Sequence, residues 1–397
     1  MITPLGLRHY FVLLGASIGL VAVASLGPAM LRSGAAPQEL RLWCATGTPV
    51  LQIGSPDDRS GGALDGVVGA HRFADGRLVV ANAGSYELRF FDARGRHRRS
   101  TGGPGDGPGE FRQLVLLRSF AGDSLLSFDA RHMRASVFGP DGEFIRSFRM
   151  PEADGFVVVA DVFADGSSVA RVNQGYRSDE AVTGRHRASI RLLELDREGA
   201  LRRDLGLFPG DESYVLASDG SMIAGPLVFG ASLHVAALRD EVVVGVSDET
   251  DLRFPGRSRP RRVSLALDDV QRLRATEADF RLVAGQYLED FPQSAREIER
   301  QRFDGMPRVE VLPVFAELRA DPAGQVWLRH QLRPDDSRRT WMVLDASGVP
   351  IARARTPDDT DILEIGSDHV LVLARDELGV ERLEVRPIER RSGLDCE

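Results

Sequence analysis

The 397-residue sequence predicts an all-β fold: a six-bladed β-propeller with a helical insertion and an N-terminal hydrophobic helix for export or anchoring. Three observations predict it. A unit of apolar runs and Asp/Gly turns recurs six times, β-branched runs within the units are nearly continuous, and the units are spaced like four-stranded blades.

An aspartate-bearing turn marks each unit. Three gaps between successive aspartates, of 48, 42 and 47 residues, fit a blade of about 40–50 residues. The other two gaps, of 75 and 81 residues, are longer and therefore contain insertions. The six marks are Asp75-Gly76, Gly122-Asp123, Asp165-Gly166, Arg239-Asp240, Asp321 to Gly324 and Ser367-Asp368.

A second turn, with Asp early and Gly late, follows in several units. Asp92 to Gly95, Asp196 to Gly199 and Asp345 to Gly348 share this pattern, which is typical of a hairpin loop with one residue at positive φ. Between the turns, runs such as Leu78–Ala81 and Val242–Val244 are continuously apolar, as expected for strands buried on both faces.

The N-terminal segment, residues 1–36, is predicted to direct export. An uncharged run at residues 10–31 follows Arg8 and His9 and is about long enough to cross a bilayer, which needs roughly 20 apolar residues. The segment is either a cleaved signal peptide or a retained anchor in the inner membrane. Residues 37–397, the propeller, are accordingly expected in the periplasm or another extracytoplasmic space.

Insertions account for the two long gaps. The polar stretch Asn173–Arg187 and a loop at Phe208–Pro226 are expected in the first. In the second, residues 268–313 show apolar residues at helical spacing, with Asp268 or Asp269 as the helix start and Pro292 as its end. This helical insertion between blades four and five is predicted to cap one face of the ring.

The two ends of the chain are predicted to close the ring. The sixth unit holds three strands, and residues 49–54 would supply its fourth strand by pairing with Val380–Ile388. Cys44 and Cys396 would then lie close together and form a disulfide, which contributes about 5 kcal/mol in the chain-entropy model. The alternative is two unpaired thiols on frayed termini.

Composition excludes several classes of function. The net charge of −8 argues against a dedicated nucleic-acid binder. All 50 basic residues are arginine, so Schiff-base chemistry and a Walker-type phosphate loop are excluded, because both require lysine.

The segment Gly102-Gly103-Pro104-Gly105-Asp106-Gly107-Pro108-Gly109-Glu110-Phe111 resembles the glycine-rich linker of NHL-type β-propellers. The preceding strands, Asp75–Asn82 and Leu88–Asp92, look like the same repeat, and Asp376–Glu381 is similar to the last blade of an uncharacterised family of bacterial six-bladed propellers. The resemblance implies an exported six-bladed propeller and no particular activity, since this fold carries many functions.

The first strand of each blade lines the central channel of a propeller. Near-equivalent positions there carry histidines or carboxylates, while blade two offers Arg118 or Ser119. Such a set could bind a divalent metal ion, or simply line a water-filled channel. The channel-lining candidates are His71, Asp161, His234, Glu317 and Glu364.

Two functions follow as hypotheses. The preferred one is an exported, non-catalytic binding or scaffold protein that recognises a protein, peptide or glycan on one face of the ring and needs no cofactor. The second is a metal-dependent lyase or hydrolase in the channel. Convergence of the five channel residues within metal-ligand distance would favour the enzyme.

Overall fold

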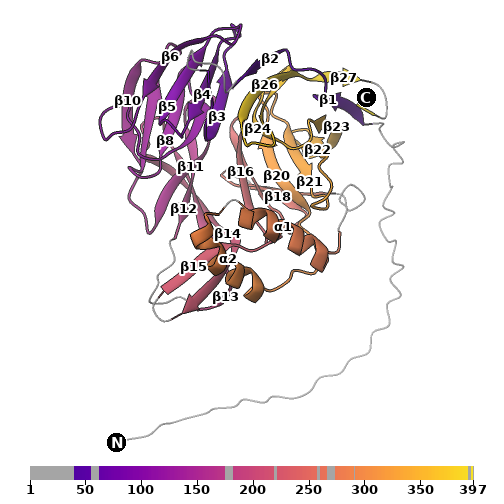
Figure 1. Ribbon diagram of the computed structural model, residues 1–397. Helices are drawn as coiled ribbons and strands as arrows, with labels where there is room; N and C mark the ends of the chain where they lie inside the picture. The colour runs from indigo at the N-terminus through magenta and orange to yellow at the C-terminus, as the bar shows by residue number, and fades with distance from the viewer. Residues whose placement is uncertain are drawn as a thin grey trace, which may run out of the picture. The chain divides into compact units, whose positions relative to one another are not determined.

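The computed structural model divides the chain into two units, Met1–Glu39 and Leu40–Glu397 (Figure 1). The predicted export segment, residues 1–36, lies outside the described residues. Among those that are described, no helix is long and apolar enough to span a membrane. The described residues are 40–54, 62–174, 182–218, 221–256, 260–265, 273–289, 291–391 and 395–396.

The second unit is a β-propeller whose described strands form six sheets (Figure 1). The first sheet contains β3 (Val67–Arg72), β4 (Leu78–Asn82), β5 (Glu87–Phe91) and β6 (His97–Gly102). The second contains β7 (Leu114–Ser119), β8 (Leu125–Asp129), β9 (Arg134–Phe138) and β10 (Phe144–Arg149). The third contains β11 (Phe156–Val162), β12 (Ser168–Asn173), β13 (Gly184–Leu195), β14 (Leu201–Ser218) and β15 (Ser221–Pro226).

The remaining sheets follow in chain order, with both ends of the chain added to the last two. The fourth sheet contains β16 (Leu233–Leu238), β17 (Glu241–Val246), β18 (Asp251–Phe254) and β19 (Arg261–Ser264). The fifth contains β20 (Phe315–Ala320), β21 (Val326–His330), β22 (Arg339–Leu344), β23 (Pro350–Thr356), β1 (Arg41–Cys44) and β27 (Glu389–Arg391). The sixth contains β24 (Thr360–Ile365), β25 (His369–Arg375), β26 (Glu381–Pro387) and β2 (Leu51–Ile53).

The hairpin turns explain why short strands recur. In the turn after β5, Asp92 Oδ1 accepts hydrogen bonds from the amides of Arg94 and Arg96, each at 3.0 Å. Gly95 completes the turn at a φ of 75°, which a side chain would disfavour. The same aspartate and glycine pattern returns in the turns of Asp196 and Asp345.

Each hydrophobic cluster of the ring joins two successive sheets. Between the first and second sheets, Leu88 packs in one cluster with Leu117. The series returns to its start, because Leu78 of the first sheet shares a cluster with Leu371 and Leu383 of the sixth. These strands are apolar on both faces because each sheet is covered by two neighbours, and that burial drives the packing.

Segments from both ends of the second unit take part in closing the ring. In the sixth sheet β2 pairs antiparallel with β26, so that Leu51 lies opposite Val385 and Ile53 opposite Leu383. The preceding strand β1 pairs with β23 in parallel and with β27 antiparallel, and it thus extends the fifth sheet.

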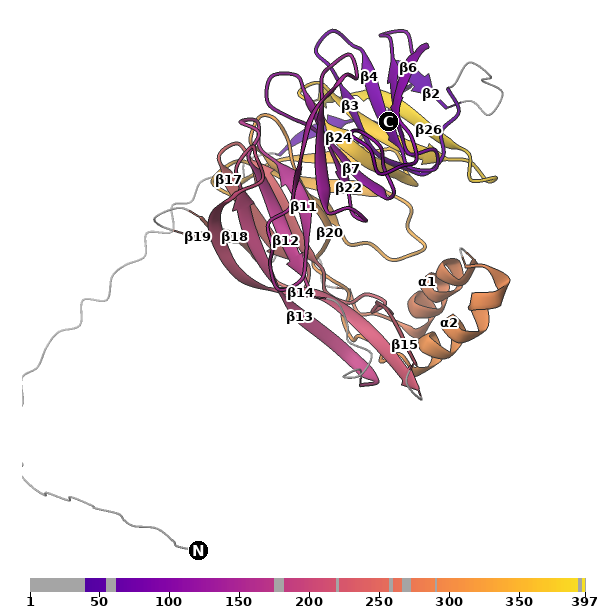
Figure 2. The ribbon, with the colours of Figure 1, turned by 90° about the vertical axis from the view of Figure 1, so that its left-hand side faces the viewer.

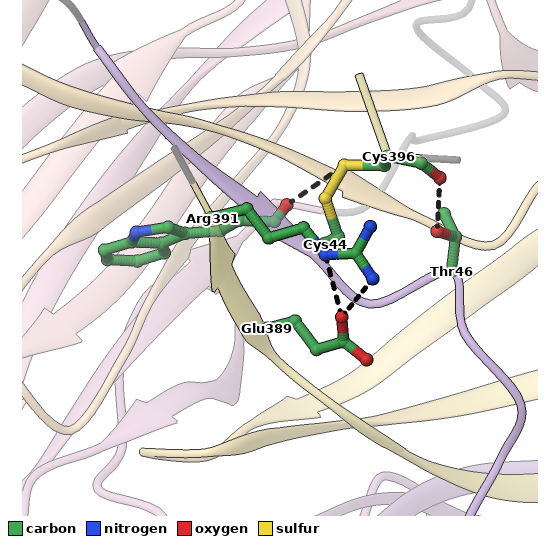
Figure 3. Close-up of a disulfide and its surroundings, with 6 residues drawn as sticks. Cys44, Thr46, Glu389, Arg391 and Cys396 are labelled. Atoms are coloured by element: carbon green, nitrogen blue, oxygen red, sulfur yellow. Dashed lines mark hydrogen bonds and ion pairs between the residues drawn. A yellow bond between two sulfur atoms is a disulfide. The ribbon is translucent and has the colours of Figure 1, made fainter. Parts of the chain in front are cut away.

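The predicted disulfide between Cys44 and Cys396 is confirmed (Figure 3). It joins the end of β1 to the C-terminal segment beyond β27. Thr46 Oγ1 adds a hydrogen bond to the Cys396 carbonyl oxygen at 3.1 Å. The disulfide therefore links the two chain ends at the edge of the fifth sheet.

The predicted loop at Phe208–Pro226 is wrong, because residues 208–218 belong to β14 and residues 221–226 to β15. Pro209 and Gly210 obscure the strand pattern, yet Pro209 pairs with Ser189 of β13. Gly210 is needed because a Cβ there would lie 2.5 Å from the Ala188 carbonyl oxygen. Residues 184–187 of the expected polar stretch also form part of β13, so the third sheet continues past the ring (Figure 2).

Two helices pack on this extension, α1 (Glu277–Glu289) and α2 (Gln293–Gly305) (Figure 2). Phe280 of α1 and Phe303 of α2 share a cluster with Tyr214 of β14. The expected starts Asp268 and Asp269 lie outside the described residues, and α1 begins at Glu277. Thr276 and Asp279 exchange hydrogen bonds between side chain and amide, which is a capping box.

Candidate functional site

The propeller has two distinct ends. The long hairpin of β13 and β14 has its turn, Asp196–Ala200, at one end and its extension at the other. We call the end that carries β15, α1 and α2 the insertion face, and the end that carries turns such as Asp196–Ala200 the turn face.

All five channel candidates lie in the first strand of a sheet. These strands are β3, β11, β16, β20 and β24, and β3 contacts β24 while β16 contacts β20. The residues on them are His71, Asp161, His234, Glu317 and Glu364, respectively.

Two of the candidates meet. His71 Nδ1 lies 2.5 Å from Glu364 Oε2, which joins the first sheet to the sixth. His369 of β25 also approaches this carboxylate, with its Nε2 3.7 Å from Glu364 Oε1. Although burial opposes ionisation, the contacts with His369 and His71 hold the pKa of Glu364 down at about 2. Glu364 is therefore an anion at neutral pH that orients two imidazoles.

The other two carboxylates are held by arginines. Asp161 accepts a hydrogen bond from Arg118 at 3.0 Å and another from the Ala237 amide at 2.9 Å. Glu317 accepts hydrogen bonds from Arg319 at 2.5 Å and from Arg329 at 3.2 Å. Both carboxylates thus already have cationic partners.

The five residues do not assemble into a metal site. Within the described part of the chain, which contains all five, no group of three or more His, Cys, Asp or Glu side chains has the geometry to hold a metal ion. The carboxylates instead pair with arginine or histidine across neighbouring strands and sheets.

His234 lines a cavity of about 450 Å³. Burial lowers the pKa of His234 to about 4, so its imidazole is neutral at pH 7. Its ring packs against Phe315, with 5.3 Å between the ring centroids. Arg171 and Asp211, which form an ion pair at 2.6 Å, line the same cavity.

A second cavity, of about 400 Å³, lies on the insertion face. Arg185 of β13 and Asp248, just after β17, line one part of it, and the segment Arg308–Pro313 after α2 lines another. Phe229, a non-glycine residue at a φ of 58°, also lines it. Such backbone strain is found at functional sites more often than elsewhere.

Sequence reasoning missed Arg171 and Asp211, which line the cavity beside His234, and His369, which approaches Glu364. The contact of Arg171 with Leu233 crosses from the third sheet to the fourth. The contact of His369 with Glu364 depends on how the strands β24 and β25 face each other. No local sequence motif signals such pairs.

Comparison with solved structures finds propeller-type proteins. A member of the DUF4221 family from Bacteroides vulgatus is 11% identical, covers 90% of this chain and 100% of its own, and has a TM-score of 0.51. An inactive virginiamycin B lyase from Staphylococcus aureus is 8% identical, with coverage of 85% and 98% and a TM-score of 0.41. A gluconolactonase from Xanthomonas campestris is 10% identical, with coverage of 86% and 96% and a TM-score of 0.42.

No protein-family model and no curated protein matches the sequence. At identities this low no activity is carried across to this chain, because one fold carries many functions. Together with the sheet topology, the likeness to the Bacteroides vulgatus structure identifies the chain as a β-propeller.

Proposed function

We propose that this chain is an exported, non-catalytic binding protein of the six-bladed, NHL-like type. It recognises a protein, peptide or glycan on its insertion face. Residues 1–36 serve as signal peptide or membrane anchor, and residues 37–397 form the propeller in the periplasm or another extracytoplasmic space. The disulfide supports this location, because disulfides persist in oxidising compartments.

The proposal rests on one observation: the helical insertion, α1 and α2, is fixed beside one end of the ring. Arg302 of α2 is almost fully buried, and it binds Glu299 at 2.8 Å and the Pro226 carbonyl oxygen at 3.3 Å. Arg333 binds Asp279 of α1 at 2.6 Å and thereby ties the helix to the turn after β21. Anchored at both points, the insertion has a fixed position beside the ring.

A cavity lies between the insertion and the ring. The cavity of about 400 Å³ between β13, Asp248 and Arg308–Pro313 is of the size that holds small ligands or one side chain of a partner. Its charged rim and apolar lining by Phe229 and Val311 offer both polar and hydrophobic contacts. This combination supports recognition on the insertion face.

The test attaches a bulky label to one face of the ring at a time, so that the label blocks access of a ligand to that face. Both cysteines of the chain are in the disulfide, so an engineered cysteine can be labelled selectively. Val311→Cys lies on the insertion face, and Ala93→Cys, in an exposed turn of the turn face, is the matched control. Each variant is labelled with maleimide–polyethylene glycol and applied to two arrays, one of defined glycans and one of defined peptides and purified exported proteins.

The expected result is binding to one array that disappears when position 311 is labelled and persists when position 93 is labelled. Absence of binding on both arrays, or equal loss at the two positions, would contradict the proposal.

The second candidate is a hydrolase or lyase, and the His71–Glu364 contact favours it. A buried carboxylate that orients an imidazole is a common general-base arrangement. A metal-dependent version needs ligands beyond this pair. Metal analysis of the purified protein, with His71→Ala as the control, tests it: stoichiometric metal lost in the variant supports the enzyme, and no bound metal removes the metal-dependent version.

A further inference from the structure

We propose that the cavity beside His234 is a subsite for a neutral sugar residue. This inference rests on the proposed binding function and gives its ligand a chemical class.

The cavity is built by three successive sheets of the ring. Val158–Ala160 come from β11, Leu233–Val235 from β16 and Leu318 from β20. Arg171 and Asn173 of β12 and Asp211 of β14 complete the lining. Its volume of about 450 Å³ falls within the range of small-molecule sites, roughly 300–1,000 Å³. A ligand here would contact first strands of the third, fourth and fifth sheets together.

The charges in the lining cancel. Arg171 Nη2 binds Asp211 Oδ2 at 2.6 Å, and Asp211 Oδ1 accepts the Leu233 amide at 2.7 Å. The imidazole of His234 is neutral at pH 7, because burial lowers its pKa to about 4. With the guanidinium already paired, the cavity offers no free charge to an anionic or cationic ligand, and a neutral ligand fits it best.

The polar groups suit hydroxyls. A hydroxyl both donates and accepts, and it can therefore pair with a carboxylate, an amide or a neutral imidazole. Asp211, with about half of its side chain exposed, is an acceptor, and the Asn173 amide both donates and accepts. The aliphatic side chains of Val158, Val235 and Leu318 give the C–H face of a sugar ring an apolar contact.

His234 is not explained by the needs of the fold. Its Nε2 is buried and has no hydrogen-bond partner within the described residues, and the same holds for Nε of Arg171. A buried polar atom without a partner destabilises the folded state, so an aliphatic residue would serve the core better at position 234. A histidine at the cavity wall is consistent with a role in ligand recognition.

The experiment measures sugar binding by calorimetry with the full exported chain. The probes are glucose, galactose, mannose and N-acetylglucosamine, together with neutral tetrasaccharides of each. Glucuronate and glucosamine are the charged comparisons. Isotope-labelled histidine is used in parallel, so that NMR reports the His234 ring directly.

The variant is His234→Leu, and the matched control is His97→Gln in the turn region of the first sheet. A neutral sugar is expected to bind wild type and His97→Gln alike, to shift the His234 ring signals, and to bind His234→Leu at least tenfold more weakly. The melting temperature of His234→Leu should equal or exceed that of wild type, which excludes misfolding as the cause. Asn173→Ala, expected to weaken binding as well, serves as a second variant.

Binding of monosaccharides identifies a free sugar as ligand, and binding of tetrasaccharides alone identifies the end of a glycan; both support the subsite. Equal affinity of wild type and His234→Leu, tighter binding of glucuronate or glucosamine, or binding of no sugar would overturn it. If His234→Leu retains array binding that a label at position 311 blocks, this inference fails while the proposed function stands. If nothing on either array binds, the proposed function fails.

Discussion

His71 Nδ1 and Glu364 Oε2 lie 2.5 Å apart across the junction of the first and sixth sheets, although 293 residues separate them in the chain. The contact joins the two sheets where the ring closes. Beside it, His369 Nδ1 lies 2.7 Å from Asp368 Oδ1 and 3.5 Å from Arg72 Nη1. The junction is therefore held by a small network of titratable groups.

This network predicts how stability depends on pH. The pKa of Glu364 is lowered to about 2, so its stabilisation is present above about pH 4.5 and is lost as pH falls toward 2. The nearby carboxylates of Glu364 and Asp368 raise the pKa of His369 despite its burial. Its stabilisation is therefore present below pH 6.5 and is lost as pH rises through the raised value.

Stability contributed by the junction should therefore be greatest between about pH 4.5 and 6.5. Urea denaturation from pH 3 to 9 measures it, with Glu364→Gln as the comparison. Between low and neutral pH, the free energy of unfolding of the variant should change by on the order of 1 kcal/mol less than that of wild type. Parallel pH profiles for both proteins would show that the network does not couple to folding.

Opening the disulfide should destabilise the ring. Cys44 and Cys396 close a loop with a sequence separation of 352, and its loss is expected to cost up to about 5 kcal/mol in the chain-entropy model. Urea midpoints with and without reductant measure the effect. The double variant Cys44→Ser/Cys396→Ser should have the urea midpoint of the reduced protein, and reductant should not change it. A midpoint of the double variant equal to that of oxidised wild type would refute a stabilising role.

The buried pair Trp341–Thr356 offers a test of core packing in the fifth sheet. Trp341 Nε1 donates to Thr356 Oγ1 at 3.1 Å, and both residues are almost fully buried. Thr356→Val keeps the shape and removes the acceptor, which should cost about 1–3 kcal/mol. Thr356→Ser keeps the hydroxyl and should retain more of the stability. Equal stability of the two variants by chemical denaturation would count against the hydrogen bond.

The capping box predicts local behaviour of the insertion. Asp279→Ala removes the cap of α1 and the ion pair with Arg333, at a cost of about 1–2 kcal/mol to the helix. Hydrogen exchange of α1 amides should accelerate roughly tenfold. The exchange rates of β8 amides should not change in Asp279→Ala. In the control variant Asp304→Ala, at an exposed position of α2, the exchange rates of α1 amides should also stay unchanged. Faster exchange throughout the ring would mean that the insertion is not a separate folding element.

Local patterns were enough to predict the parts of the fold that depend on neighbouring residues. The Asp and Gly of the Asp92–Gly95 turn act within one hairpin, and the glycine takes the positive φ that the pattern implies. The disulfide was predictable because pairing of residues 49–54 with Val380–Ile388 brings the flanking Cys44 and Cys396 close together.

Contacts between distant strands were not predictable in the same way. The extension of β14 is hidden by Pro209 and Gly210, whose fit depends on the partner strand β13. β1 was not expected in the fifth sheet, because its pairing with β23 and β27 leaves no periodic signal. The channel-lining candidates were chosen by residue type alone and stay a prediction. Their arginine partners, such as Arg329 for Glu317, depend on packing between strands.

Amide hydrogen exchange, measured with and without the tightest-binding compound from the arrays, tests recognition on the insertion face most directly. The account predicts slower exchange in β16 (Leu233–Leu238) and in Arg308–Pro313, with unchanged exchange in the turns at Asp92–Gly95 and Asp196–Gly199. Protection of those turns, without protection of β16 and Arg308–Pro313, would contradict it.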